Sequence, residues 1–276
     1  EIELKTLSII TVCLNCEFEI KETLKSVCSQ LSSEIVDKVE LILVDGQSMD
    51  GTVETAKKMT EKLKYMGVSV EFLSEPDSGI YDAMNKGLKM AAGKWVYMLN
   101  AGDIFHPDFC LKELLDFLDK TLADVVYGNT LRKSLAYEEE WIPGPVYMIK
   151  RGMIFCHQSV FIKRTLQENH YDLSYKLCAD YDLVSRLYVG GKKFVHFNEM
   201  VSVYSLEGIT AKAKMVETYQ ETYSIRKKYY LEGNRLSIKM IYVLGLKKRQ
   251  FLQVIPDGLR WKLVKMSRVV LRKKHY

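Results

Sequence analysis

The sequence contains no long apolar run. Its 276 residues are 47% hydrophobic and 27% charged, which is an ordinary globular balance, and its apolar stretches are as short as VELILV (39–44) and MIYVLGL (240–246). Because a helix that spans a bilayer needs about 20 apolar residues, we expect no transmembrane segment. The sequence also opens without a basic region followed by an apolar stretch, so we expect no secretory signal.

Cysteine is sparse. Six cysteines are scattered through a sequence without an export signal, which favours reduced thiols in the cytosol. Cys13 and Cys16 form a CxxC pair, but no second pair follows at the spacing of a zinc site. We interpret both as small packing residues. A metal or redox role is the alternative.

Two common phosphate-binding motifs are absent. No GxGxxG follows the first expected strand, so a Rossmann dinucleotide site is not supported. The segment GLKMAAGKW (87–95) has five residues between its glycines and a tryptophan after the lysine, which does not fit a Walker A loop.

The excess of positive over negative charge lies at the end of the sequence. Residues 245–276 contain ten Lys or Arg and one Asp, a net charge of +9, so the remainder carries −4 of the total of +5. A mildly acidic body argues against nucleic-acid binding, since nucleic acids are bound by basic surfaces. The basic tail instead predicts contact with an anionic surface.

Short β-branched runs alternate with amphipathic stretches in the first hundred residues. Strands are expected at residues 7–12, 39–44, 68–73 and 95–99, and helices at 17–30, 52–64 and 80–92. This alternation predicts βαβ units and a mainly parallel sheet. The later elements that we expect are helices at 179–189 and 212–231 and strands in KKFVHF (192–197) and MVSVY (200–204), with 141–164 covering the far side of a pocket.

Parallel sheets of this kind bind ligands at the carboxyl ends of their strands, where loops and helix N-termini meet. Each expected strand is followed by small or acidic residues, in CLN (13–15), DGQSMDGT (45–52), SEPDSG (74–79) and NAGD (100–103). Asp45 is placed to accept a hydrogen bond from an imide N–H such as that of uracil. Taken alone, however, its loop is equally compatible with a structural turn.

Six segments carry a family resemblance: SIITVCLN, LILVDGQSMDGT, SEPDSGIYDAMNKGLKMAAGKW, MLNAGD, CHQSVF and ADYDLVSRL. In order and spacing they resemble the family 2 glycosyltransferases, over about residues 7–205, and especially bacterial members that assemble O-antigens, capsules and exopolysaccharides. The resemblance implies the GT-A fold, a Rossmann-like α/β domain with a mainly parallel central sheet. We expect this domain at 1–210, with a nucleotide-binding half at about 1–103 and an acceptor half at about 104–210, followed by a helical extension with a basic amphipathic tail at 211–276.

The resemblance also implies a nucleotide-sugar site. The matching residues are Thr11, Asn15, Asp45, Ser48, Asp50, Glu75, Asp77, Lys86, Asn100 and His157. Asn15 and Asp45 would line the nucleobase pocket, with Ser48 and Asp50 in the same loop as Asp45. Glu75, Asp77 and Lys86 would border the sugar and the diphosphate.

Two histidines have simpler alternatives to a role in the site. A lone histidine is often a structural hydrogen-bonding residue, so His157 is either a pocket residue, as in the family, or such a residue. His196, within FVHF, is expected to be a half-buried strand residue.

Asp103 matches the family's metal-binding carboxylate. Relatives carry two or three acids in this stretch, whereas here Asp103 is the only acid after Asn100, Ala101 and Gly102. Mn²⁺ or Mg²⁺ uses one or two carboxylates together with phosphate oxygens and water. A cation bridging Asp103 and a diphosphate is therefore expected, with weak affinity in the absence of nucleotide.

Asp180, in ADYDL, matches the family's general base, which deprotonates the acceptor hydroxyl. The glutamate that normally precedes it is Ala179 here. The simpler alternative is that Asp180 only caps a helix. Asp182 is the reserve candidate, although two residues further along a helix it points to another face.

The tail predicts a membrane contact. Leu259, Leu263, Met266 and Val270 form a helical stripe opposite basic residues, and Trp261 adds an amphipathic anchor. A helix that packs on the protein core is the alternative. A tail bound to the cytoplasmic membrane face would suit an acceptor carried on a polyprenyl lipid.

These features together predict an inverting, metal-dependent hexosyl- or N-acetylhexosaminyl-transferase. It would move a sugar from a UDP-sugar to a hydroxyl of a glycan during surface polysaccharide biosynthesis, and we expect this glycan to be linked to polyprenyl diphosphate. A catalytically idle nucleotide-sugar-binding or scaffold protein is the first alternative, suggested by the single acid at Asp103 and by Ala179. A sugar nucleotidyltransferase is the second, but the Gly-rich, Arg-containing first loop of that class is missing.

Overall fold

The computed structural model describes residues 5–134, 138–167, 170–205, 215–231, 242–247 and 249–250. The chain divides into two compact units, Glu1–Glu207 and Gly208–Tyr276. The amphipathic segment expected around Leu259 and Val270 lies outside the described residues. In the described ranges no helix is both long and apolar enough to cross a membrane.

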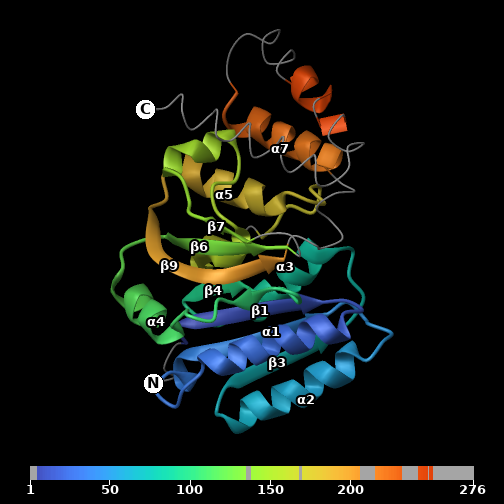
Figure 1. Ribbon diagram of the computed structural model, residues 1–276, viewed down its shortest axis with the longest axis vertical. Helices are drawn as coiled ribbons and strands as arrows, with labels where there is room; N and C mark the ends of the chain where they lie inside the picture. Colours follow the sequence, from blue (N-terminus) through green and yellow to red (C-terminus); the bar gives the residue numbers. More distant parts are fainter. Residues whose placement is uncertain are drawn as a thin grey trace. The chain divides into compact units, whose positions relative to one another are not determined.

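The first unit is an α/β structure (Figure 1). Its strands are β1 (Leu7–Cys13), β2 (Val39–Asp45), β3 (Ser69–Ser74), β4 (Trp95–Met98), β5 (Ile104–Phe105), β6 (Val125–Lys133), β7 (Glu138–Trp141), β8 (Val160–Lys163) and β9 (Phe194–Ser205). Its α-helices are α1 (Glu17–Gln30), α2 (Thr52–Tyr65), α3 (Ile80–Met90), α4 (Leu111–Lys120) and α5 (Ala179–Val189). Short 3-10 helices are η1 (Val36–Lys38), η2 (Val146–Arg151), η3 (His157–Ser159) and η4 (Arg164–Gln167).

In the described chain these nine strands form one sheet, in the order β3-β2-β1-β4-β8-β6-β9-β5, with β7 paired to β6. Strands β3, β2, β1 and β4 are mutually parallel. Strand β8 is antiparallel to both β4 and β6, and β9 is parallel to β6. The expected parallel sheet therefore forms the first half, and antiparallel strands extend it.

Helices cover both faces of the sheet. On one face, apolar side chains of α1, α2 and α4, such as Leu24, Leu63 and Leu114, form a continuous buried cluster with Ile9 and Leu41 of the sheet. On the other face, α3 packs on β1 and β2. Alternate residues of β1 point to opposite faces, so nearly every residue of this buried strand must be apolar or small.

Helix α3 approaches β1 closely. A Cβ atom at Gly87 would lie 2.5 Å from Cγ2 of Ile10, so glycine is required for this packing. The approach fixes α3 against the strand whose end carries the first loop of the candidate site.

The second half departs from the expected elements in two places. Residues 194–205 form one strand, β9, where two were expected, because Asn198 and Glu199 lie in a β-bulge opposite Gly128 instead of in a turn. A Cβ at Gly128 would lie 2.3 Å from Val201 Cγ2, so the bulge packs directly on this glycine. Helix α4 and strand β6 were not predicted, although the Leu residues of α4 have helical spacing.

The second unit contains α7 (Met215–Tyr229), within the helix expected at 212–231. Residues 242–247 are also helical. Tyr219 and Tyr223 of α7 pack against Tyr242, with ring centroids 5.8 and 4.2 Å apart. These tyrosines therefore pack helices together.

Candidate functional site

The site is the edge of the sheet where β1, β2, β3 and β4 end. Because these strands are parallel, the loops that follow them lie along one edge. The strand order also reverses between β1 and β4, since β2 and β3 lie on one side of β1 and β4 on the other. In open α/β sheets such a reversal opens a crevice that binds ligands.

The loops after β1 and β2 are joined by Asn15 and Ser48. The Ser48 hydroxyl accepts the Asn15 N–H at 2.8 Å, and Oδ1 of Asn15 accepts the Met49 N–H at 2.9 Å. Asn15 adopts a left-handed backbone conformation, with φ of 47°, which asparagine tolerates better than most residues. The loops after β1 and β2, which were predicted to line the nucleobase pocket, thus form one hydrogen-bonded unit.

Asp45 lies beneath this unit and is fully buried. Its carboxylate accepts hydrogen bonds from the Ser48 N–H at 3.0 Å, the Ser48 hydroxyl at 2.5 Å and the Ser74 hydroxyl at 2.6 Å. Asp45 therefore ties the ends of β2 and β3 together, and its role toward a nucleobase stays a prediction.

Asp50 is exposed at the start of α2. Its Oδ1 accepts the Thr52 N–H at 3.0 Å, and hydrogen bonding with Thr52, chiefly with its side chain, lowers the pKa of the Asp50 carboxyl. The structure thus gives Asp50 a capping contact. Its predicted place near the nucleotide remains untested.

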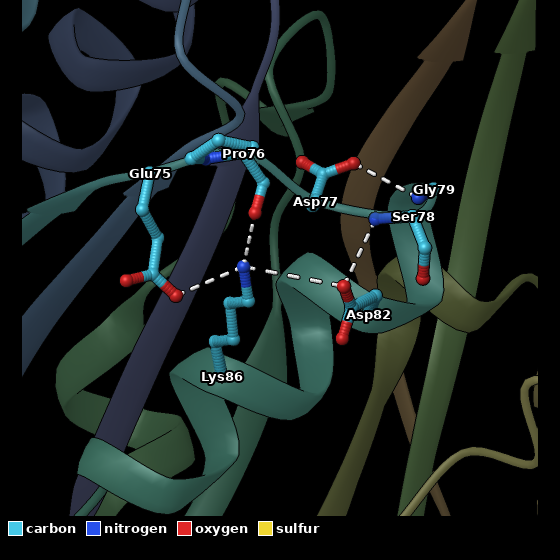
Figure 2. A network of polar contacts seen from close by, with 7 residues as sticks. All are labelled: Glu75, Pro76, Asp77, Ser78, Gly79, Asp82 and Lys86. Carbon is cyan, nitrogen blue, oxygen red and sulfur yellow. Dashed lines mark hydrogen bonds and ion pairs between the residues drawn. The ribbon is translucent and has the colours of Figure 1, made fainter.

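Lys86 is the centre of a polar network at the start of α3 (Figure 2). Its Nζ atom lies 2.9 Å from Glu75 Oε1, 2.5 Å from the Pro76 carbonyl oxygen and 4.0 Å from Asp82 Oδ2. The hydrogen bond with Glu75 is the main cause that raises the pKa of Lys86, so the ammonium stays charged. The network holds Lys86, which was predicted to border the sugar and the diphosphate, against the loop that follows β3.

The same loop turns through Asp77 and Gly79. The Asp77 carboxylate accepts the Gly79 N–H at 2.9 Å, and the Asp82 carboxylate accepts the Ser78 N–H at 2.9 Å (Figure 2). Gly79 has φ of 131°, a conformation that L-residues rarely adopt. A Cβ at Gly46 would lie 2.4 Å from Asp77 Oδ2, so the loops after β2 and β3 touch.

The turn after β4 holds Asp103 in a buried position. Gly102 has φ of 96° and donates its N–H to the Thr23 hydroxyl, which in turn donates to the Asp103 carbonyl oxygen at 2.8 Å. Burial raises the pKa of the Asp103 carboxyl to about 7, opposed by a hydrogen bond from the Gln158 side chain. The sheet edge thus holds a carboxyl group whose ionised form is poorly solvated by water.

The side-chain oxygens of the Asn100–Asp103 turn suit a hard divalent cation as ligands. In the same turn as Asp103, Oδ1 of Asn100 is buried and has no hydrogen-bond partner among the described residues. Oxygen ligands of this kind suit Mn²⁺ or Mg²⁺. In the described chain no group of three or more His, Cys, Asp or Glu residues is arranged to hold a metal, so a cation there would need further oxygens from a ligand.

His157 reaches this turn through the antiparallel strand β8. Because Phe161 pairs with Tyr97, the residues that precede β8 lie beside those that follow β4. Burial lowers the pKa of His157, so the ring is neutral at pH 7. Its Nε2 atom lies 3.3 Å from Nδ2 of Asn100 and accepts from that amide, which leaves the ring proton on Nδ1.

Asp180 opens α5 and faces His157. Its Oδ2 atom is 3.7 Å from Nδ1 of His157, and its Oδ1 atom accepts the Tyr81 hydroxyl at 3.1 Å and the Tyr181 N–H at 2.8 Å. Asp180 and His157 also line a pocket whose other walls are largely apolar, including Met98 and Leu183. The predicted base therefore lies in the same site as the Asn100–Asp103 turn.

Three predicted residues lie away from these contacts. Thr11 is fully buried within β1, and its hydroxyl has no partner among the described residues. Asp182 is 1% exposed inside α5, so solvent does not reach it as it does Asp180. His196 is half-buried on β9, as expected, and its Nε2 atom lies 2.8 Å from Oδ1 of Asn129.

Two residues of the site were not predicted. Tyr81 lies within the SEPDSGIYDAMNKG segment and contacts Asp180, and Gln158 follows His157 and contacts Asp103. Gln158 is next to the predicted His157 in the sequence, and Tyr81 lies between the predicted Asp77 and Lys86. Their contacts are non-local, and only proximity to the motifs pointed toward them.

The fold and the site together define a GT-A glycosyltransferase. Residues 8–172 match the family model described as Glycosyl transferase family 2. The chain therefore belongs to glycosyl transferase family 2. It is 30% identical over 187 residues to a PGL/p-HBAD biosynthesis glycosyltransferase of Mycobacterium bovis, a match that covers 66% of this chain and 69% of that protein.

Solved structures confirm the expected GT-A fold. The S. aureus protein TarS, residues 1–349 in complex with UDP, superposes with a TM-score of 0.64 at 16% identity, over 92% of this chain and 76% of that one. The mannosyltransferase PcManGT from Pyrobaculum calidifontis, in complex with GDP-Man and Mn²⁺, gives a TM-score of 0.66 at 16% identity, over 96% and 80%. At this identity the likeness concerns the fold alone.

Proposed function

We propose that this family 2 enzyme is an inverting transferase that moves a hexosyl or N-acetylhexosaminyl group from a UDP-sugar to a hydroxyl of a glycan. The observation that supports this most is the joint placement of Asp180, His157 and the Asn100–Asp103 turn at the edge that carries the donor loops. A base, a buried carboxylate and a nucleotide-binding sheet edge are the parts that such a transfer requires.

In the proposed mechanism, Asp180 accepts the proton of the acceptor hydroxyl as that oxygen attacks the anomeric carbon. General-base assistance of this kind contributes roughly 10² to 10⁴ in rate. Direct displacement with one base inverts the configuration at that carbon. His157, neutral and held by Asn100, keeps its Nδ1–H toward Asp180.

The leaving diphosphate carries negative charge that the described acidic loops cannot stabilise alone. Asp103, together with Asn100 of the same turn, would hold Mn²⁺ or Mg²⁺, which supplies Lewis-acid stabilisation of the departing diphosphate when bound. Lys86 adds a cation on the donor side, within reach of the Glu75–Gly79 loop. TarS in complex with UDP supports the choice of a uridine nucleotide. GDP is the competing nucleotide, because PcManGT was solved with GDP-Man.

The acceptor and its location are further parts of the proposal. We infer a glycan linked to polyprenyl diphosphate, used in surface polysaccharide biosynthesis, and an enzyme held at the cytoplasmic face of the membrane by its basic tail. The ten basic residues of 245–276 support this, since each contributes about 1 kcal/mol of attraction to an anionic leaflet. Most residues that line the apolar pocket beside Asp180, such as Leu183, belong to the expected acceptor half, whereas Met98 belongs to the expected nucleotide-binding half.

Thermal unfolding with UDP, GDP, TDP and CMP, each with and without Mn²⁺, tests the donor and the metal. Ligand at a hundred times its dissociation constant stabilises a protein by about 2.7 kcal/mol. We expect a Mn²⁺-dependent shift with UDP in the wild type and none in Asp103→Ala. A shift with GDP alone would change the donor. No shift with any nucleotide would favour the idle scaffold protein.

A further inference from the structure

The carboxylate of Asp180 is held asymmetrically. Its Oδ1 atom receives two hydrogen bonds, from the Tyr81 hydroxyl at 3.1 Å and from the Tyr181 N–H at 2.8 Å. Its Oδ2 atom is 3.7 Å from His157 Nδ1, which is beyond ordinary hydrogen-bond distance. Since Oδ1 is already engaged by two donors, Oδ2 is the oxygen available to take a proton from a substrate.

Tyr81 is a fixed donor. It is 9% exposed, and its ring packs on Tyr171 with centroids 5.4 Å apart. Burial, with a smaller contribution from the Asp180 charge, raises the pKa of Tyr81 well above its ordinary value, so the hydroxyl keeps its proton. Tyr81 therefore donates to Asp180 throughout the pH range in which enzymes work.

The partner ring is fixed by the same helix. One turn after Tyr81 in α3, the Asn85 side chain donates to the Tyr171 carbonyl oxygen at 2.9 Å and accepts the Tyr171 N–H at 2.8 Å. Residues four apart lie on one helix face, so Tyr81 and Asn85 together clamp the segment that leads into α5. The position of Asp180 thus depends on the position of α3.

The first turn of α3 also carries the donor-side loop. Asp82, next to Tyr81, accepts the Ser78 N–H at 2.9 Å, and Lys86 is bonded to Glu75 and to the Pro76 carbonyl oxygen (Figure 2). A diphosphate that binds Lys86 must compete with the contacts that Lys86 makes to Glu75 and Pro76. Any resulting movement of the loop after β3 is transmitted to Tyr81 through the first turn of α3.

We infer that Tyr81 is a positioning residue. Its hydrogen bond orients Oδ2 of Asp180 toward the acceptor hydroxyl and links this orientation to the loop after β3. The inference rests on the proposed function. In the step concerned, the acceptor oxygen forms a bond to the anomeric carbon and its proton passes to Oδ2. The bond from that carbon to the diphosphate oxygen breaks, and its electron pair leaves with the diphosphate.

The kinetic test uses Tyr81→Phe, which keeps the ring and its packing and removes only the hydroxyl. The probe is hydrolysis of UDP-glucose, UDP-N-acetylglucosamine and GDP-mannose with Mn²⁺, followed by nucleotide release, with water as the acceptor. We expect kcat to fall about tenfold while the KM for the sugar nucleotide stays within about twofold. A fall in donor affinity with unchanged kcat would overturn the inference.

Thr6→Val is the matched control. It removes a buried hydroxyl that, like that of Tyr81, donates to a carboxylate, here Asp119 Oδ1 at 3.2 Å, at a position outside the candidate site. We expect its kcat to match the wild type. If both variants lose kcat equally, loss of any buried hydroxyl hydrogen bond explains the effect and the positioning role is wrong.

A second measurement does not need turnover. A double-mutant cycle compares the unfolding equilibria of wild type, Tyr81→Phe, Asp180→Ala and the double variant. We expect Tyr81→Phe to favour unfolding about tenfold when Asp180 is present and less than about threefold when it is absent. Equal effects in both backgrounds would show that the contact does not couple the two residues.

The two failures are distinguishable. Wild-type protein without turnover on any of the three sugar nucleotides, or Asp180→Ala with full turnover, would refute the proposed function. The cycle on the same proteins would still decide whether Tyr81 holds Asp180. Coupling without any effect of Tyr81→Phe on kcat would refute the positioning role alone.

Discussion

Replacing Asp103 by Asn should make the protein more stable at neutral and alkaline pH, although Asp103 is the predicted metal ligand. The carboxyl is 7% exposed, and burial raises its pKa from 3.8 to about 7. In the unfolded chain the group ionises near pH 4. Between these two pH values the unfolded chain ionises at Asp103 whereas the folded protein does not. The free energy of unfolding of the wild type therefore falls as the pH rises through this interval.

The magnitude follows from linkage. Below about pH 4 the carboxyl is protonated in both states, so Asp and Asn are equivalent. As the pH rises to about 7, only the unfolded chain releases the proton, and a pKa difference of about three pH units corresponds to about 4 kcal/mol at 1.36 kcal/mol per unit. At 2–4 °C per kcal/mol for a domain of this size, the melting temperature should rise by roughly 10 °C.

The assay is thermal unfolding in EDTA between pH 4 and pH 8, so that bound metal does not offset the charge. We expect the stability gain of Asp103→Asn to be near zero at pH 4 and to grow until about pH 7. Asp108→Asn is the control, because its side chain is 92% exposed and should give no such growth. A gain that is absent at pH 8, or equal at pH 4 and pH 8, would refute the argument from burial.

Three further predictions concern the base, the packing and the tail. Asp180→Asn should lower turnover by roughly 10² to 10⁴ and leave UDP affinity by calorimetry unchanged, and an equal loss of UDP affinity would contradict its role as base. Gly87→Ala should destabilise the protein by about 1–3 kcal/mol in urea unfolding, because its Cβ would lie 2.5 Å from Ile10 Cγ2. Gly144→Ala is the control and should leave stability unchanged, because a Cβ there would meet no atom within 4 Å. Deleting residues 247–276 should release the protein from anionic liposomes at moderate salt, and unchanged co-sedimentation would exclude the tail as an anchor.

The sequence by itself determined the parallel half of the sheet and the edge that carries the site. Strands β1 and β2 and helices α1 and α2 lie within one residue of their expected bounds, because hydrophobic periodicity is a local property and each element is flanked by turn residues. Small and acidic residues after each strand were enough to predict a ligand-binding edge, since parallel strands bring their carboxyl ends together. The motif around Asp180 was likewise recognisable as a local pattern.

Only the tertiary structure decided how the site residues meet. Tyr81 and Asp180 are 99 residues apart in sequence, and His157 reaches Asn100 because β8 is antiparallel to β4. The raised pKa of Asp103 comes from its burial, which no local pattern specifies. These properties depend on which strands and helices pack side by side, and that is set by long-range contacts across the whole unit.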